Sequence, residues 1–343
     1  MMLSRLFFHW ENYLSKRDTN RTVRPFEWGL EFISDMPRSG KGALSPDLEP
    51  KEFLLEYAKQ AVAESDRYHC YEPVRDFRLE GRHLRYTSPL PTIYPENNTV
   101  LGRYFPVDSK GRVVLVLPQW NSDAGGHISL CRMLNYYGLS ALRLSLPYHD
   151  ARMPEGMLRA DYMLSSNIGR TLQAVRQAVV DTRAAIDWLQ SRGYYKFAIL
   201  GTSVGSCVAF ITVAHDTRIE TAVQNHVSPY FADVVWRGIS TRHVRAGLEG
   251  HISIEDLRNI WMPISPKAYF RKIAGTAKKT LLVHALYDYT FLPELSAEVL
   301  EDYRKLRLIH STLALRCGHY TSGVFPFNVI LGCAMCWYIR KNL

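Results

Sequence analysis

Residues 197–215, FAILGTSVGSCVAFITVAH, decide the fold of this 343-residue chain. The run FAIL is typical of a strand buried on both faces of a sheet, and the apolar run that begins at Val204 is typical of a helix. Between them, GTSVG at 201–205 matches the pattern Gly-x-Ser-x-Gly. A strand, this turn and a helix in succession predict a nucleophile elbow, a strained turn that lifts the Ser203 hydroxyl above the sheet. The alternative is an ordinary tight turn with an incidental serine.

On both sides of this stretch, strand and helix patterns alternate. We expect strands at 113–118, 139–147, 197–200, 220–226, 280–286 and 306–315, preceded by a hairpin at 74–88 and a short strand at 100–105. We expect helices ending near Tyr137, at 166–191, at 204–214, from Pro293 onward and at the C-terminus. This alternation predicts an α/β fold with a mainly parallel, doubly wound sheet covered by helices on both faces.

Candidate partners for Ser203 follow later strands. A serine hydroxyl is a weak nucleophile unless a base removes its proton and a third group orients that base. Such groups should follow strands, because ligands bind at the carboxyl ends of the strands in such sheets. Asp288 follows the next-to-last predicted strand and His319 follows the last one. We therefore expect Ser203 as nucleophile, His319 as base and Asp288 as orienting acid, with Asp233 as the alternative acid.

Three motifs give the chain a family resemblance. PQWN at 118–121, PYHD at 147–150 and GTSVGS at 201–206 resemble motifs of a little-characterised branch of the α/β-hydrolase superfamily. The resemblance covers residues 74–343 and has the chain order Ser, Asp, His of that fold. It implies hydrolysis of esters, thioesters or amides, with no metal and no organic cofactor.

The resemblance also implies an oxyanion hole made of two backbone N–H groups. The first donor should be Val204, the residue after the nucleophile. Many superfamily members have His-Gly at the end of the strand that precedes the first long helix, whereas this chain has PQWN. The second donor is therefore Gln119, Trp120 or Asn121, and we favour Trp120.

Further polar and aromatic residues are candidates for the pocket. We expect Gln119, Asn121, His127 and Trp236 to contact substrate. His149 and Asp150 follow a predicted strand and either line the pocket or form a structural turn. The other histidines, His226 among them, lie in or beside core elements and are interpreted as structural, and none shows metal-binding spacing.

The domain organisation has two departures from a plain α/β-hydrolase domain at 74–343. The stretch 229–270 interrupts the alternation, is rich in aromatic residues and is expected to be a cap insertion that lines the pocket, or a helical elaboration packed for stability. Residues 1–73 are expected to form an N-terminal helical extension with a loop at 35–50. Apolar residues from Leu3 to Leu14 recur at helical spacing, so the first helix either docks on the domain or makes peripheral contact with a membrane.

Composition excludes several classes of protein. The chain is 47% hydrophobic and carries a net charge of +9, but its basic residues are scattered, so we expect no nucleic-acid partner. Its six cysteines form no disulfide framework, and no signal peptide is visible, so we expect a cytoplasmic protein.

The expected function is a serine hydrolase acting on a small-molecule or lipid-like acyl ester or thioester. The alternatives are an acyltransferase with the same triad and a non-catalytic binding protein with the same fold.

Overall fold

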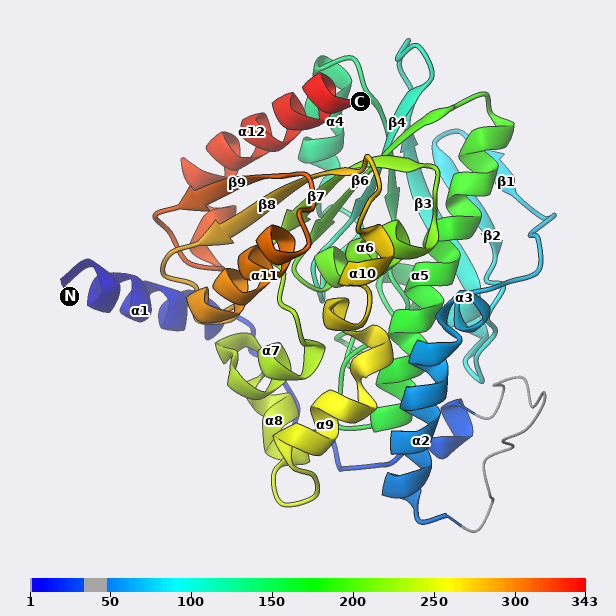
Figure 1. Ribbon diagram of the computed structural model, residues 1–343. Coiled ribbons are helices and arrows are strands. Elements are labelled where there is room, and N and C mark those ends of the chain that lie inside the picture. Colours follow the sequence, from blue (N-terminus) through cyan, green and yellow to red (C-terminus); the bar gives the residue numbers. More distant parts are fainter. Residues whose placement is uncertain (1, 34–47) are drawn as a thin grey trace.

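The structure, a computed structural model, describes residues 2–33 and 48–343 (Figure 1). Most of the loop predicted at 35–50 therefore lies outside the described residues. The described chain contains a nine-stranded sheet in the order β1-β2-β3-β5-β4-β6-β7-β8-β9. β1, β2, β3 and β5 pair antiparallel in turn, and the sheet is parallel from β5 to β9. The predicted α/β class with a mainly parallel sheet is confirmed.

The strands lie where the apolar runs predicted them. Their bounds are β1 Arg78–Glu80, β2 His83–Thr87, β3 Thr99–Phe105, β4 Arg112–Leu117, β5 Ser140–Leu144, β6 Lys196–Thr202, β7 Ile219–Asn225, β8 Lys279–Ala285 and β9 His310–Leu315. β9 begins four residues later than predicted, because the preceding helix ends in a turn in which Arg307 has a φ of 53° and Leu308 N–H bonds to Tyr303 O.

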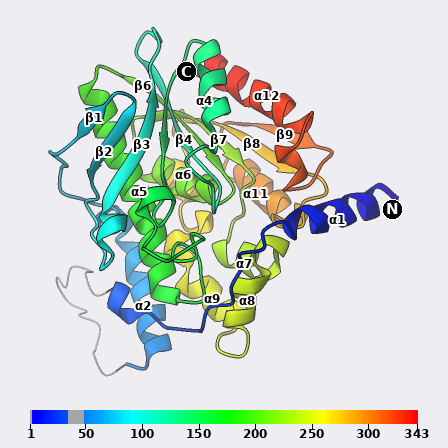
Figure 2. The ribbon, with the colours of Figure 1, turned by 180° about the vertical axis from the view of Figure 1, so that it is seen from behind.

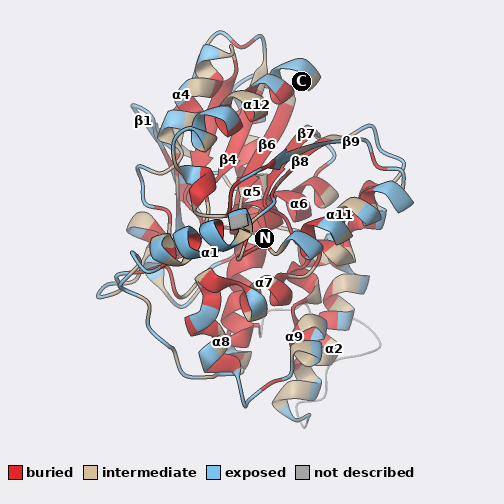
Figure 3. Ribbon diagram, turned by 90° about the vertical axis from the view of Figure 1, so that its left-hand side faces the viewer, coloured by how far each residue is buried: buried red, intermediate tan, exposed pale blue. Residues whose placement is uncertain are grey.

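Alternation along the central strands divides the core between the two faces of the sheet. In β4, Val113, Leu115 and Leu117 belong to one buried cluster, and Val114 and Val116 belong to the other. Because successive strand residues point to opposite faces, a strand covered on both sides needs an uninterrupted apolar run. Figure 3 shows these strands and the long helix α5 as almost wholly buried.

Helices cover both faces of the sheet. The helices are α1 Met2–Ser15, α2 Pro50–Ala63, α3 Ser65–Tyr68, α4 Ile128–Tyr136, α5 Ile168–Ser191, α6 Val204–His215, α7 Phe231–Arg237, α8 Arg242–Leu248, α9 Ile254–Ile260, α10 Phe270–Ile273, α11 Pro293–Lys305 and α12 Phe327–Asn342. α5, α6 and α11 contribute to one core cluster, whereas α4, α12 and Phe7 of α1 contribute to the other. Asn167 caps α5 by accepting a bond from Arg170 N–H, as expected of a helix N-cap.

α1 lies beside the β8–β9 edge of the sheet, as Figures 1 and 2 show. It buries Phe7, Glu11 and Ser15, which share one face, and exposes much of the rest of its surface. Among the helices in the described ranges, none has both the length and the apolar content needed to span a bilayer. Contact of α1 with a membrane stays a prediction.

Candidate active site

Ser203 occupies a strained turn between β6 and α6. Its φ of 56° and ψ of −121° lie in a region that residues other than glycine rarely adopt. The flanking glycines make this turn possible. A Cβ on Gly201 would lie 2.2 Å from Gly205 O, and a Cβ on Gly205 would lie 2.4 Å from Leu117 O. The backbone here therefore has the tight, strained form that the Gly-x-Ser-x-Gly motif predicts.

Asp288 and His319 meet in the loops that follow β8 and β9. His319 Nδ1 lies 3.2 Å from Asp288 Oδ2 and hydrogen bonds to it. The other carboxylate oxygen, Oδ1, accepts bonds of 2.7 Å from the backbone N–H groups of Thr290 and Phe291. The His319 ring stacks on the Phe291 ring, with centroids 5.4 Å apart. Carboxylate and imidazole are thus both held in one orientation, with His319 Nε2 left without a partner among the described residues.

Electrostatics favours an ionised Asp288 beside a basic His319. Burial opposes charge on Asp288, but His319 and the hydrogen bonds it receives hold the pKa of Asp288 below its ordinary value. Burial also lowers the pKa of His319, but the Asp288 charge and hydrogen bond outweigh it and raise that pKa above its ordinary value. These opposite shifts are what mutual stabilisation of a carboxylate and an imidazolium produces.

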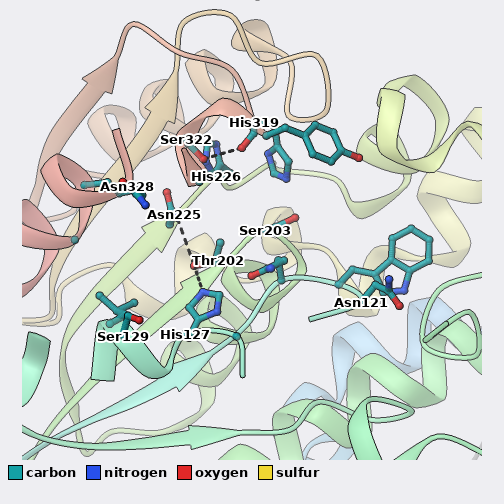
Figure 4. A pocket seen from close by; sticks show the side chains of 18 of the residues that line it. Asn121, His127, Ser129, Thr202, Ser203, Asn225, His226, His319, Ser322 and Asn328 are labelled. Atoms are coloured by element: carbon teal, nitrogen blue, oxygen red, sulfur yellow. Dashed lines mark hydrogen bonds between the residues drawn. The ribbon is translucent and has the colours of Figure 1, made fainter. Parts of the chain in front are cut away.

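Ser203 and His319 line the same cavity, which has a volume of about 640 Å³ (Figure 4). No hydrogen bond joins their side chains within the described part of the chain. The structure therefore brings all three predicted triad residues to one edge of the sheet, with one formed contact, between His319 and Asp288.

A second histidine contacts the same carboxylate. His226 follows β7, is 1% exposed and places Nδ1 3.0 Å from Asp288 Oδ2, although its N–H is not aligned as a hydrogen bond. Burial lowers the pKa of His226, which favours its neutral form. The sequence predicted a structural histidine here, which agrees with its burial, but it did not predict the contact with Asp288. That contact could have been expected, because His226 directly follows a strand at the same edge as Asp288 and His319.

The backbone around β4 and α6 supplies candidate oxyanion donors. Val204 N–H heads α6 and makes no hydrogen bond with the described residues. Asn121 N–H is already engaged, because it donates to His149 Nε2 at 2.8 Å. Burial lowers the pKa of His149 to about 4, so its ring is neutral and can accept. Of the three predicted second donors, the backbone N–H groups of Gln119 and Trp120 make no hydrogen bond with the described residues, whereas that of Asn121 does.

The predicted pocket residues differ in where they lie. Gln119, Trp120, Asn121 and His127 all line the 640 Å³ cavity. His127 Nε2 lies 3.1 Å from Thr202 Oγ1, and burial lowers the pKa of His127 to about 4. A second, smaller cavity of about 40 Å³ also reaches Ser203. Its lining includes Trp120, Leu164, Val204, Cys207, Phe231, Val234 and Phe291.

Trp236 differs from its prediction. It lines neither of the two cavities beside Ser203, and instead its ring packs against the Arg245 guanidinium, 5.6 Å from the ring centroid. The reason is that α7 turns its Phe231 and Val235 side inward and leaves Trp236 half-buried. The alternative acid Asp233 forms two hydrogen bonds with Arg258, of 2.6 and 2.9 Å, and does not contact His319.

The aromatic residues of the predicted cap are mostly core residues. Trp261, Tyr269 and Phe270 are 0%, 1% and 3% exposed and belong to the core cluster shared with α5 and α6. Phe231 is the ring of this stretch that reaches a cavity beside Ser203. Within the stretch 229–270, Phe231 is therefore the aromatic residue that contributes to a cavity wall, and Trp261, Tyr269 and Phe270 pack in the core.

The cluster also contains potential metal ligands. One nitrogen each from His226 and His319 and one oxygen of Asp288 lie within 4.8 Å of one another. A metal bound through His319 Nδ1 would replace the proton that forms the hydrogen bond to Asp288. Metal binding in that mode and the His319–Asp288 hydrogen bond therefore exclude each other.

Comparisons with known proteins identify the fold. No protein-family model matches the chain, and no curated protein matches it in sequence. Among solved structures, an acetyl xylan esterase from Paenibacillus sp. is similar with a TM-score of 0.59 and 15% identity, over 88% of this chain and 97% of the esterase. A Pyrococcus furiosus esterase is similar with a TM-score of 0.53 and 14% identity, over 88% of this chain and 97% of that one.

A Pyrococcus horikoshii acylaminoacyl peptidase is similar with a TM-score of 0.59 and 13% identity. The match covers 78% of this chain but only 42% of the peptidase, so this chain corresponds to less than half of that protein. At these identities the likeness concerns the fold. The chain has the α/β-hydrolase fold.

Proposed function

We propose that this protein is a serine hydrolase that cleaves a carboxylic ester through an acyl-enzyme on Ser203. His319 takes the proton of Ser203 as its oxygen attacks the ester carbonyl, and Asp288 holds the imidazole in the required orientation. The backbone N–H of Val204, with that of Trp120 or Gln119, stabilises the oxyanion. His319 then protonates the leaving alcohol, and water releases the acyl group with His319 again as base.

One observation carries this proposal: Ser203, in its strained turn, and His319, hydrogen-bonded to Asp288, line a single cavity. The absence of a bond between Ser203 and His319 is compatible with it, because catalytic hydrogen bonds in free enzymes are often long and tighten in the complex. The likeness to two esterases and a peptidase supports a hydrolase, and the ester preference is part of the proposal.

The two cavities favour a short acyl group and a larger alcohol. The cavity bordered by Phe231, Val234 and Cys207 has room for about 40 Å³ and is lined mainly by apolar side chains, which suits an acetyl or propionyl group. The 640 Å³ cavity, which also borders Ser203, combines polar groups such as Gln119 and Asn121 with apolar side chains such as Met133 and Leu331, which suits a large leaving group with polar and apolar parts.

The decisive experiment for the function combines labelling and turnover. A fluorophosphonate probe should label the wild type, and p-nitrophenyl acetate should be hydrolysed. Both signals should disappear in Ser203→Ala. Absence of labelling and turnover in the folded wild type would favour a non-catalytic binding protein. Acyl transfer to an added alcohol in preference to water would favour an acyltransferase.

A second experiment tests the acyl-size preference. Across p-nitrophenyl esters of increasing chain length, kcat/KM should be highest for acetate or propionate and should fall beyond butyrate. Phe231→Ala should move the optimum to longer chains, because it removes a ring from the small cavity. Phe270→Ala removes a similarly buried ring outside both cavities and should leave the profile unchanged. A wild-type preference for octanoate would refute the assignment of the small cavity.

A further inference from the structure

A buried acid on α1 contacts the loop that carries His319. Glu11 is 0% exposed, although it belongs to a helix at the edge of the molecule. Its Oε2 accepts a bond of 2.9 Å from Tyr320 N–H, and its Oε1 accepts a bond of 2.8 Å from Thr321 N–H. Both carboxylate oxygens are therefore used on the two residues that directly follow His319.

The same side chain also packs against the residue before His319. A Cβ on Gly318 would lie 2.3 Å from Glu11 Cδ, so the glycine leaves the space that the carboxylate fills. Gly318 N–H in turn donates to Thr321 Oγ1 at 2.6 Å. The turn from Gly318 to Thr321 is thus built around the Glu11 carboxylate, and the His319 ring projects from that turn.

α1 contacts the loop of Asp288 as well. The Phe7 and Tyr287 rings are stacked, with centroids 4.7 Å apart and planes 9° apart. The Phe8 and Tyr289 rings meet edge to face at 5.0 Å. Tyr287 and Tyr289 are the two neighbours of Asp288 in sequence. The first half of α1 therefore packs against the loop that carries Asp288, and Glu11 binds the loop that carries His319.

We infer that α1 is part of the catalytic apparatus. Glu11 is a positioning residue that fixes the conformation of the loop carrying His319, and Phe7 fixes the position of the loop carrying Asp288. This inference rests on the proposed function, because it assigns α1 to the same triad. It also explains why a carboxylate is buried at a helix face that otherwise contains apolar and small residues. Backbone N–H groups on both oxygens are the partners that such a burial requires.

A positioning role predicts more than a loss of stability. Asp288, His226 and Tyr320 lie against the His319 ring, and Glu11 acts on it through its charge from the adjoining backbone of residues 320 and 321. Burial lowers the pKa of His319, and the charges of Asp288 and Glu11 raise it. Removing the Glu11 charge should therefore lower the pKa of His319, which moves the acidic limb of the kcat/KM profile to lower pH.

The test is Glu11→Gln. Glutamine keeps the shape and one acceptor, but its NH₂ group faces the second backbone N–H and the loop loses a bond. We expect kcat to fall by about 10- to 100-fold with KM changed less than about twofold, since small misplacement of a catalytic group costs this much. The acidic limb should shift to lower pH. Unchanged kcat and unchanged pH profile in folded Glu11→Gln would overturn the inference.

A control variant separates positioning from docking of the N-terminal segment. Glu27 also attaches this segment to the domain, through a bond from Asn167 Nδ2, but it touches neither triad loop. Glu27→Ala removes that bond and should leave kcat and the pH profile unchanged; an effect equal to that of Glu11→Gln would show that docking alone matters and would refute the role of Glu11.

If Glu11→Gln fails to fold, Phe7→Ala tests the same inference through the loop that carries Asp288. It removes the stacking on Tyr287 and should lower kcat by at least about tenfold. Wild-type activity in Phe7→Ala would then refute the inference. Failure of the function itself gives a different result, an unlabelled and inactive wild type. An active wild type with fully active α1 variants would leave the function intact and remove α1 from it.

Discussion

Replacing Asp288 by asparagine should stop His319 from acting as a base, because the structure fixes how the new amide must lie. Oδ1 receives two backbone N–H bonds of 2.7 Å, so the amide oxygen of the introduced asparagine has to take that position. The NH₂ group then occupies the position of Oδ2 and faces His319 Nδ1. The imidazole must accept there, which moves its own proton to Nε2, and Nε2 can no longer take the Ser203 proton.

The size of the effect follows from those two backbone bonds. The opposite amide orientation would keep the productive tautomer but would lose both bonds, at a cost of about 1 kcal/mol each. A difference of about 2 kcal/mol leaves about 3% of molecules productive. We therefore expect kcat to fall at least about 30-fold from the wrong tautomer alone. Loss of the Asp288 charge, which stabilises the His319 imidazolium, can bring the fall to about 10⁴-fold, as in other triads.

The assay is kcat on p-nitrophenyl acetate, with circular dichroism melting to confirm that Asp288→Asn is folded. Asp233→Asn is the matched control, since Asp233 is an equally buried acid whose carboxylate pairs with Arg258. That variant should keep near wild-type kcat. A fall of less than tenfold in folded Asp288→Asn, or a larger fall in Asp233→Asn, would refute the assignment of the acid.

Three further predictions follow from the site. The kcat/KM of the wild type should rise with pH with a midpoint above about 6.5, because His319 must be neutral to act as base and its pKa is raised; a midpoint at or below 6.5 in a pH–rate profile would contradict this. Gly205→Ala should lower the free energy of unfolding by about 1–3 kcal/mol in urea titration, because its Cβ would lie 2.4 Å from Leu117 O, whereas Gly323→Ala, with open space around it, should change it by less than about 0.5 kcal/mol. Dialysis against EDTA should leave kcat unchanged, because each proposed step uses only protein groups and water; a loss of activity that Zn²⁺ restores would contradict this and would make the His226–Asp288–His319 cluster a candidate metal site.

Much of the fold could be predicted from local patterns, for physical reasons. A strand covered on both faces must be apolar throughout, so β4, β6 and β8 stand out as runs in the sequence. The antiparallel edge is also visible, since Gly81 marks the turn of the β1–β2 hairpin. The ends of elements are less predictable: β9 starts late because the turn that follows α11 occupies residues 306–309, which look equally suited to a strand.

The prediction that Trp236 contacts substrate was wrong, again because the sequence does not show how a helix is placed on the core. Sequence shows that the stretch from 229 to 270 is aromatic but not which rings point toward Ser203. That depends on how α7 is rotated on the core, and the rotation buries Phe231 and leaves Trp236 half-buried. Aromatic content alone therefore predicts burial better than it predicts contact with a cavity.

The sequence analysis did not predict that His226 and Glu11 lie beside the proposed triad, and the reason differs between the two residues. His226 obeys the rule that identified Asp288 and His319, because all three follow parallel strands whose carboxyl ends lie at one edge. Consistent use of that rule predicts it. Glu11 obeys no such rule, since its place beside His319 depends on where α1 docks, more than three hundred residues away in sequence. Helical periodicity puts Glu11 on the face of Phe7 and Ser15, and an acid on a face that docks needs a partner inside the protein. The sequence could thus have raised the question of that partner, and only the tertiary contact answers it.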